Sequence, residues 1–195
     1  MSAAAESFVE PPWDEPLDAE QVLAEIPESA TIAGMFFLAL ADGAERRQVD
    51  LAMPRPRYVP FSFYPVREFA PLLVKAAGLF SPHSTLREGL RRIGRVGPSA
   101  FLGSTLGRVT LGASEGVQAT VSAIAKTYGI NTKPSRCTVL QTEPRSVTLA
   151  LDDVCYFLDS HHVGVFEGTL EHADVQGRVL IRRRSATAAD FRLEW

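Results

Sequence analysis

The chain of 195 residues is 46% hydrophobic, carries a net charge of −3 at pH 7 and contains two cysteines. Its length and composition suit one globular domain with a full core, and its negative charge gives no general attraction to nucleic acids or acidic membranes. No apolar run approaches the roughly 20 residues that cross a bilayer, and two cysteines cannot form a disulfide framework. The first residues also lack the pattern of a secretory signal, so we expect a cytoplasmic protein with no membrane span and no nucleic-acid partner.

Residues 1–30 combine four prolines with many acidic residues, which predicts a mobile acidic, proline-rich N-terminal arm ahead of a single domain at residues 31–195. One short helix is expected at residues 18–26, with Asp18 as its N-cap. The arm is either a solubilising tail or a peptide that binds a partner. In the second case its anchors would be the apolar residues Phe8, Val9 and Trp13.

The strongly apolar stretch 31–41 predicts a short strand that leads into a buried helix. Three prolines at positions 54, 56 and 60 make residues 52–60 an extended surface connection. A helix is expected from Pro65, at its first helical position, as far as Ser81. Its apolar residues keep the spacing of an amphipathic helix: Phe69, Leu72, Leu73, Ala76, Ala77 and Phe80.

The next helix is expected to begin after Ser84, which can act as its N-cap. Gly97-Pro98 predicts an interruption, followed by a further helical stretch at residues 99–111. Residues 115–128 predict another helix, with Gly129 as its C-cap.

The C-terminal part of the chain predicts the order strand, strand, helix, strand, strand. The strands are expected at residues 137–143, 146–151, 178–184 and 188–195, and the helix at residues 156–172. The fold class is therefore α/β of the α+β type, with helices packed on a four-stranded antiparallel sheet in the C-terminal half. Gly164 and Gly168 lie four residues apart, and we expect them where this helix crosses the sheet.

Three runs carry a resemblance: Phe63-Tyr64-Pro65-Val66-Arg67-Glu68, the run from Leu86 to Arg95, and the closing Phe191-Arg192-Leu193-Glu194-Trp195. Over residues 31–195 the chain resembles an uncharacterised paralogous family expanded in myxobacteria. That family is similar to the nitric-oxide-signalling and Golgi-transport ligand-binding fold, which includes heme–nitric-oxide domains, vinyl-reductase-type sensors and trafficking subunits. The resemblance implies helices on a four-stranded antiparallel sheet, often dimeric, serving sensing or assembly.

The resemblance also allows a test for heme, because heme domains of that fold use a histidine in the helix before the sheet and a Tyr-x-Ser-x-Arg motif between the sheet and the final helix. Residues 115–128 contain no histidine, and residues 149–159 contain no such motif. We therefore expect the protein to bind no heme, and no other cofactor is indicated.

The remaining polar residues give no sign of catalysis or of a metal site. His161 and His162 are adjacent, so on a helix they point about 100° apart and cannot chelate one ion together; we expect one packed and one exposed imidazole. Cys137 and Cys155 are expected as small buried hydrophobic residues. The glycine run at residues 103–107 lacks a phosphate-loop pattern, and the chain has no Gly-x-Ser-x-Gly elbow. We therefore expect no enzymatic activity.

Arg87, Arg91 and Arg95 have the i, i+4, i+8 spacing of a stripe along one helical face. Guanidinium groups pair with carboxylates, so the stripe could bind an acidic partner or an anion. The alternatives are a solvated face that pairs with Glu88, and the acidic arm of the same chain lying along the stripe.

The sequence leaves two candidate functions for the protein. The first is a non-enzymatic regulatory or interaction module that binds a protein partner in signalling or assembly, with self-association into a homodimer. The second is a sensor of a small apolar ligand without heme, with a pocket near Phe63, Tyr64, Phe101 and Phe166. A pocket of some hundreds of Å³ would favour the sensor.

Overall fold

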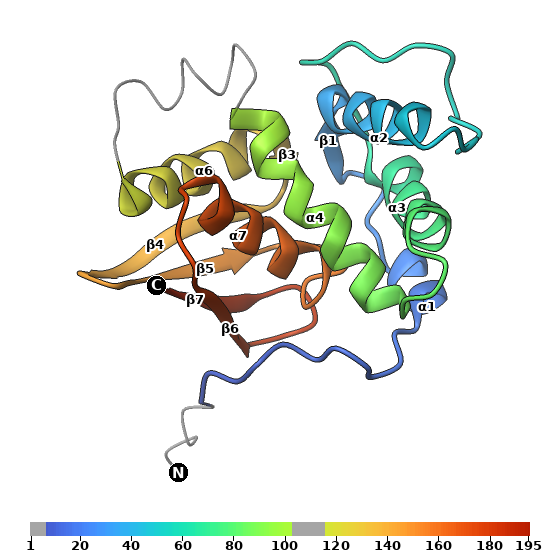
Figure 1. The fold of residues 1–195 in the computed structure, drawn as a ribbon. Helices are drawn as coiled ribbons and strands as arrows, with labels where there is room; N and C mark the ends of the chain where they lie inside the picture. Colours follow the sequence, from blue (N-terminus) through green and yellow to red (C-terminus); the bar gives the residue numbers. More distant parts are fainter. Residues whose placement is uncertain (1–6, 103–115) are drawn as a thin grey trace.

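The computed structural model describes residues 7–102 and 116–195. Their elements form an α+β fold with a four-stranded antiparallel sheet in the C-terminal half, as the sequence predicts (Figure 1). Most of the predicted helix 99–111 and the glycine run at residues 103–107 lie outside the described residues. Within the described residues no helix combines the length and the apolar character needed to cross a membrane.

The C-terminal sheet consists of β4 (Arg136–Glu143), β5 (Ser146–Asp152), β6 (Arg178–Arg183) and β7 (Ala189–Glu194) in the order β4-β5-β7-β6. All three pairings are antiparallel. The strands lie within one or two residues of their predicted bounds, because apolar and polar residues alternate along β6 and turn residues separate β4 from β5.

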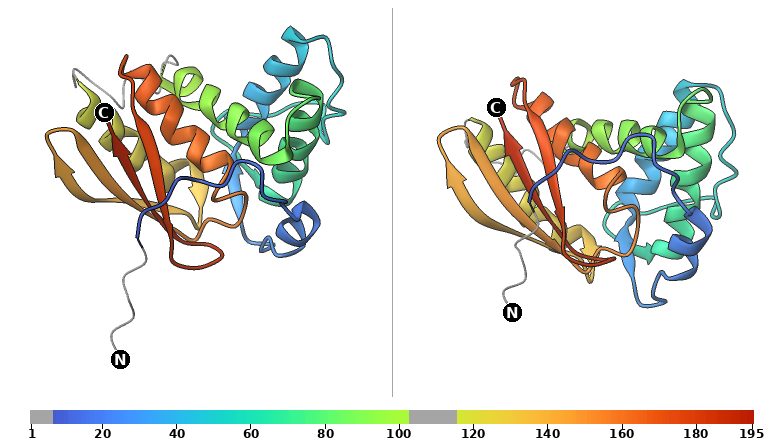
Figure 2. Two further views of the ribbon diagram at one scale, coloured as in Figure 1. Left: turned by 60° about the horizontal axis from the view of Figure 1, so that its bottom comes forward. Right: turned by 90° about the horizontal axis from the view of Figure 1, so that it is seen from below.

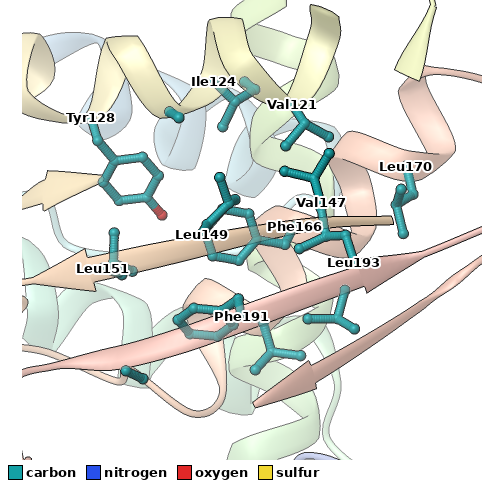
Figure 3. Close-up of a cluster of buried hydrophobic side chains, with 14 of the residues drawn as sticks. Val121, Ile124, Tyr128, Val147, Leu149, Leu151, Phe166, Leu170, Phe191 and Leu193 are labelled. Atoms are coloured by element: carbon teal, nitrogen blue, oxygen red, sulfur yellow. The ribbon is translucent and has the colours of Figure 1, made fainter. Parts of the chain in front are cut away.

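One face of this sheet is covered by α6 (Val117–Asn131) and α7 (His161–His172), as Figures 1 and 2 show. Side chains from the two helices and the central strands meet in the sheet-side core (Figure 3). Its fully buried members include Val121, Leu149, Phe166, Phe191 and Leu193. These apolar side chains hold the helices on the sheet.

The N-terminal half forms a separate helical layer of α1 (Ala19–Ala24), α2 (Gly34–Arg46), α3 (Val66–Phe80) and α4 (Leu86–Leu102). Phe37 stacks on Tyr58 at 4.3 Å between ring centroids and meets Phe69 edge-on at 5.1 Å, in a second buried cluster that we call the helical core. The strand leading into a helix predicted at residues 31–41 is confirmed as β1 (Thr31–Ala33) followed by α2.

A three-stranded sheet in the order β2-β1-β3 was not predicted. It pairs β1 with β2 (Phe63–Pro65) and with β3 (Thr132–Lys133), both antiparallel. Strands of two or three residues are too short to show an alternating pattern. Because β3 follows α6 directly, this small sheet joins the helical layer to the sheet-side layer.

Several predicted helix ends are wrong. Pro65 is the N-cap of α3, not its first helical residue, and α4 is capped by Thr85, whose Oγ1 accepts from the Glu88 amide at 3.2 Å. The helix α4 continues through Pro98, which removes one backbone hydrogen bond without ending it. The helix α6 likewise continues past Gly129.

The largest difference in bounds is at α7, which begins at His161 and not at residue 156. Asp153 and Phe157 have positive φ angles of 57° and 41°, which a right-handed helix cannot contain. Residues 153–160 therefore form an irregular connection before the helix.

The described part of the N-terminal arm is packed on the domain and is not the mobile tail that we expected. Val9 and Ile181 exchange two backbone hydrogen bonds of 2.9 Å, so the arm extends the sheet beyond its edge strand β6. The arm then runs past α7 and α4 to α1, as the views in Figure 2 show. The α1 N-cap is confirmed, since Asp18 accepts from the Gln21 amide at 2.9 Å.

Helices α4 and α7 cross in very close contact, and glycines make this possible. A Cβ added at Gly164 would lie 2.0 Å from the Arg91 carbonyl oxygen, and one at Gly168 would lie 2.0 Å from that of Arg95. From the other helix, a Cβ at Gly94 would lie 2.0 Å from the His161 carbonyl oxygen. The expectation that Gly164 and Gly168 face the sheet is therefore wrong: they face α4.

Replacing Gly168 with leucine, or Gly164 with alanine, is expected to lower the free energy of unfolding by about 1–3 kcal/mol or more, because the added atoms meet backbone that cannot move aside. Gly78→Ala on α3 is the matched control, since its Cβ meets nothing within 4 Å; it should be neutral or stabilising by up to about 1 kcal/mol. Urea denaturation of the variants measures these changes. Equal stability of Gly164→Ala and the parent would contradict the close crossing.

Candidate functional site

The four aromatic residues expected at one pocket lie in different places. Phe166 is fully buried in the sheet-side core, 4.7 Å from the Phe191 ring centroid. Tyr64 packs in the helical core, where its hydroxyl accepts from the Val59 amide at 2.9 Å, and Phe63 is 44% exposed. Of the four, Phe101 alone lines the cavity described next.

A cavity of about 910 Å³ lies between the helical layer and the sheet-side layer. Its walls come from α2, α3, α4, α6 and the start of α7, and they are mainly apolar. The aromatic members of this wall include Phe36, Phe69, Phe80, Phe101, Tyr128 and Tyr156. Most of these residues were not predicted to line a site, because each belongs to an ordinary amphipathic pattern and the faces that meet are decided by the tertiary packing.

The inner wall of the cavity holds a small group of neutral polar side chains. The Tyr128 hydroxyl and His162 Nδ1 are 2.7 Å apart, and the His161 and His162 ring centroids are 5.3 Å apart. His161 Nδ1 and His162 Nε2 are buried without a hydrogen-bond partner among the described residues. The expectation of one exposed imidazole is therefore wrong, because both rings lie within the wall.

Burial sets the charge of this group. It lowers the pKa of His161 to about 4, and together with the neighbouring His161 it lowers the pKa of His162 well below its ordinary value. Burial also raises the pKa of Tyr128 and of Tyr156. All four side chains are thus uncharged near pH 7, so the inner wall favours a neutral part of a ligand.

Neither cysteine is placed for nucleophilic chemistry. Burial raises the pKa of Cys137 to about 12 and also raises that of Cys155, so both thiols are protonated near pH 7. Within the described residues there is also no cluster of three or more histidine, cysteine or acidic side chains that could hold a metal ion.

The three arginines of the predicted stripe do share one face of α4, but that face is turned toward α7. Arg87 and Arg91 are 7% and 6% exposed. Arg87 pairs with Asp159 at 2.7 Å, while Arg91 and Arg95 both pair with Glu167. The acidic partner of the stripe is therefore supplied by the chain itself.

The N-terminal arm packs on two of these arginines, Arg87 and Arg91. The Arg91 guanidinium lies over the Trp13 ring, 3.1 Å from its centroid, and Arg87 donates to the Glu15 carbonyl oxygen at 2.9 Å. The arm thus lies along the stripe, as one of the sequence-based alternatives proposed. Its contacts are a tryptophan ring and backbone carbonyls, and not the acidic side chains that motivated the idea.

Removing the shared carboxylate in Glu167→Ala is expected to destabilise the fold by about 3–5 kcal/mol, because the buried Arg91 charge is left unpaired. Glu88→Ala is the control, since Glu88 pairs with the exposed Arg92 and its loss should cost at most about 1 kcal/mol. Chemical denaturation gives both values. Similar decreases in the free energy of unfolding of the two variants would show that the buried Arg91–Glu167 pair stabilises the fold no more than an exposed pair does.

The stability of the fold is expected to fall as the pH is lowered from 7.5 to 5.5. His161 and His162 have lowered pKa values when folded, so their contribution is fully present above the unfolded pKa of about 6.5 and is lost below it. Each can contribute up to about 1.4 kcal/mol per pH unit. Urea denaturation at three pH values measures the slope, which His161→Phe should reduce. A flat profile in the parent would contradict the burial of both imidazoles.

The fold is similar to those of solved H-NOX proteins. The Fe(II) unliganded H-NOX protein from K. algicida is 14% identical, covers 84% of this chain and 96% of its own, and has a TM-score of 0.61. The H-NOX protein from S. oneidensis in the Fe(II)NO ligation state is also 14% identical, covers 84% and 98%, and has a TM-score of 0.62. At these identities the similarity shows the fold alone. Comparison with curated proteins finds no match.

The residues present do not fit the heme-binding arrangement that the resemblance implies. Helix α6, which precedes the large sheet, contributes Ile124, Thr127, Tyr128 and Asn131 to the cavity and contains no histidine. The connection between β5 and α7 contributes Tyr156 but contains no arginine. The imidazoles of the cavity wall stand on α7 instead, and their unpaired nitrogens are covered by protein.

The match to a family model identifies the group to which the chain belongs. The model described as protein of unknown function (DUF2378) covers residues 26–195, which include every described element from β1 to β7. The chain is therefore a member of the DUF2378 family, with a fold similar to that of H-NOX proteins.

Proposed function

We propose that the protein is a non-enzymatic, cytoplasmic regulatory domain that senses a small, mainly apolar molecule without heme. The observation that carries this proposal is the cavity of about 910 Å³, lined by aromatic and aliphatic side chains between the helical and sheet-side layers. Pockets of roughly 300–1,000 Å³ with such linings are typical of small-molecule sites. The sequence resemblance to a family expanded in myxobacteria, and through it to sensor and trafficking domains, supports a regulatory setting.

The position of the cavity also supports sensing. Its walls combine residues of the helical core, such as Phe69 and Leu73, with residues of the sheet-side core, such as Ile124 and Tyr128. A bound molecule would therefore contact both layers at once. A ligand that binds one relative arrangement of the layers more tightly shifts the population toward it.

Binding of a protein partner is a second candidate, and it is favoured by a specific surface. Val59, Phe61 and Phe63 are 48%, 63% and 44% exposed on one short stretch of chain. Exposed apolar side chains that gather in this way are typical of interaction sites. Phe61 also lines the cavity, so a partner on this surface would sit beside a bound ligand.

Binding of the neutral fluorescent dye Nile red tests the proposal, with an expected stoichiometry of one dye per chain. Ala39 lines the cavity, so Ala39→Trp should fill part of it and weaken dye binding at least tenfold, by about 1.4 kcal/mol. Ala24→Trp is the control, because Ala24 is an exposed residue of α1 outside the cavity. If both variants bind the dye like the parent, or if neither the dye nor other small apolar molecules bind the parent, the cavity is not a ligand site.

A further inference from the structure

The exposed residues of the cavity wall mark its mouth, and this mouth is basic. They include Asp42, Arg46, Arg47, Phe61, Arg92 and Val96. The mouth therefore carries three arginines and one aspartate, which gives it a positive charge although the whole chain has a net charge of −3. The inner wall carries no charge near pH 7, since His161 and His162 remain neutral there.

Two of the three arginines have no acidic partner among the described residues. Arg92 pairs with Glu88, whereas neither Arg46 nor Arg47 forms an ion pair within that part of the chain. Arg46 and Arg47 stand at the end of α2, side by side in the sequence. Their guanidinium groups are thus available to an external anion.

Arg47 connects the charged mouth to the apolar interior. Its guanidinium lies over the Phe80 ring, 4.6 Å from the centroid, and Phe80 is itself part of the cavity wall. It also donates to the Gly43 carbonyl oxygen at 3.1 Å, which covers one of the negative backbone groups at the end of α2. This hydrogen bond therefore places the Arg47 guanidinium over one of the carbonyl oxygens that would repel an anion at this mouth.

We propose that the cavity binds an anionic amphiphile of the fatty-acid type, with its carboxylate at Arg46 and Arg47 and its apolar chain among the aromatic side chains of the interior. This inference rests on the proposed function and names its ligand class. An apolar chain matches the wall, and a single negative headgroup matches the mouth. A neutral ligand of the same length would leave the two arginines without a partner.

The test compares decanoate with 1-decanol, which have the same chain length and differ in the charge of the headgroup. Both compete with Nile red at pH 8, and both are titrated directly by calorimetry. The parent should bind decanoate about tenfold more tightly than decanol at low salt. Roughly 1 M NaCl should reduce this preference, because the arginines are exposed to solvent.

The double variant Arg46→Gln/Arg47→Gln should lose the preference for decanoate and keep its affinity for Nile red. The control Arg57→Gln/Arg136→Gln removes the same charge from exposed residues outside the cavity, and it should keep the preference. Equal binding of decanoate and decanol by the parent would overturn the inference, as would a preference that survives in the double variant.

The outcomes separate this inference from the proposed function. If Nile red binds and Ala39→Trp weakens it, but decanoate has no advantage over decanol, the ligand site stands and the anionic ligand class is wrong. If neither Nile red, decanoate nor decanol binds the parent, the proposed function fails as well. The direct calorimetric titration shows whether decanoate binds, and whether it binds more tightly than decanol, even if the dye does not bind.

Discussion

The close crossing of α4 and α7 is the contact on which the rest of the structure depends. Glycines on both helices let the two backbones approach until added side-chain atoms would lie 2.0 Å from carbonyl oxygens. Beside the crossing, Glu167 holds both Arg91 and Arg95 in a largely buried group. The ion pairs therefore lie where the helices are already held together. The arginine and glutamate side chains consequently lose less conformational entropy when they pair.

This crossing also determines where the cavity lies. Helix α7 packs on the large sheet and α4 packs on α3, so the crossing joins the sheet-side core to the helical core. The two layers meet through this contact and through the small sheet at β1. Between these two connections their side chains do not fill the space, which leaves the cavity of about 910 Å³.

The sequence predicts the elements of the large sheet well and the site poorly, for a physical reason. Strands such as β5 and β7 show their apolar faces in the local residue order. The wall of the cavity, by contrast, combines Phe36 of α2 with Tyr128 of α6, and no local pattern relates such distant residues. The arginine stripe illustrates the same difference. Its sequence spacing correctly predicts that the three arginines share one face of a helix, but their burial depends on Asp159 and Glu167, which lie more than 70 residues away in the chain.

Helix α7 lines the cavity and also supplies the acidic partner of an α4 arginine on which the N-terminal arm packs. Its first residue, His161, belongs to the cavity wall, and Glu167 on the same helix holds Arg91 beneath Trp13. On the same helix, Gly164 and Gly168 bring the α7 backbone against that of α4, where an added Cβ would lie 2.0 Å from the Arg91 and Arg95 carbonyl oxygens. A residue of the cavity wall and the carboxylate that pairs with Arg91 therefore stand on one helix, which is packed against α4 through its middle.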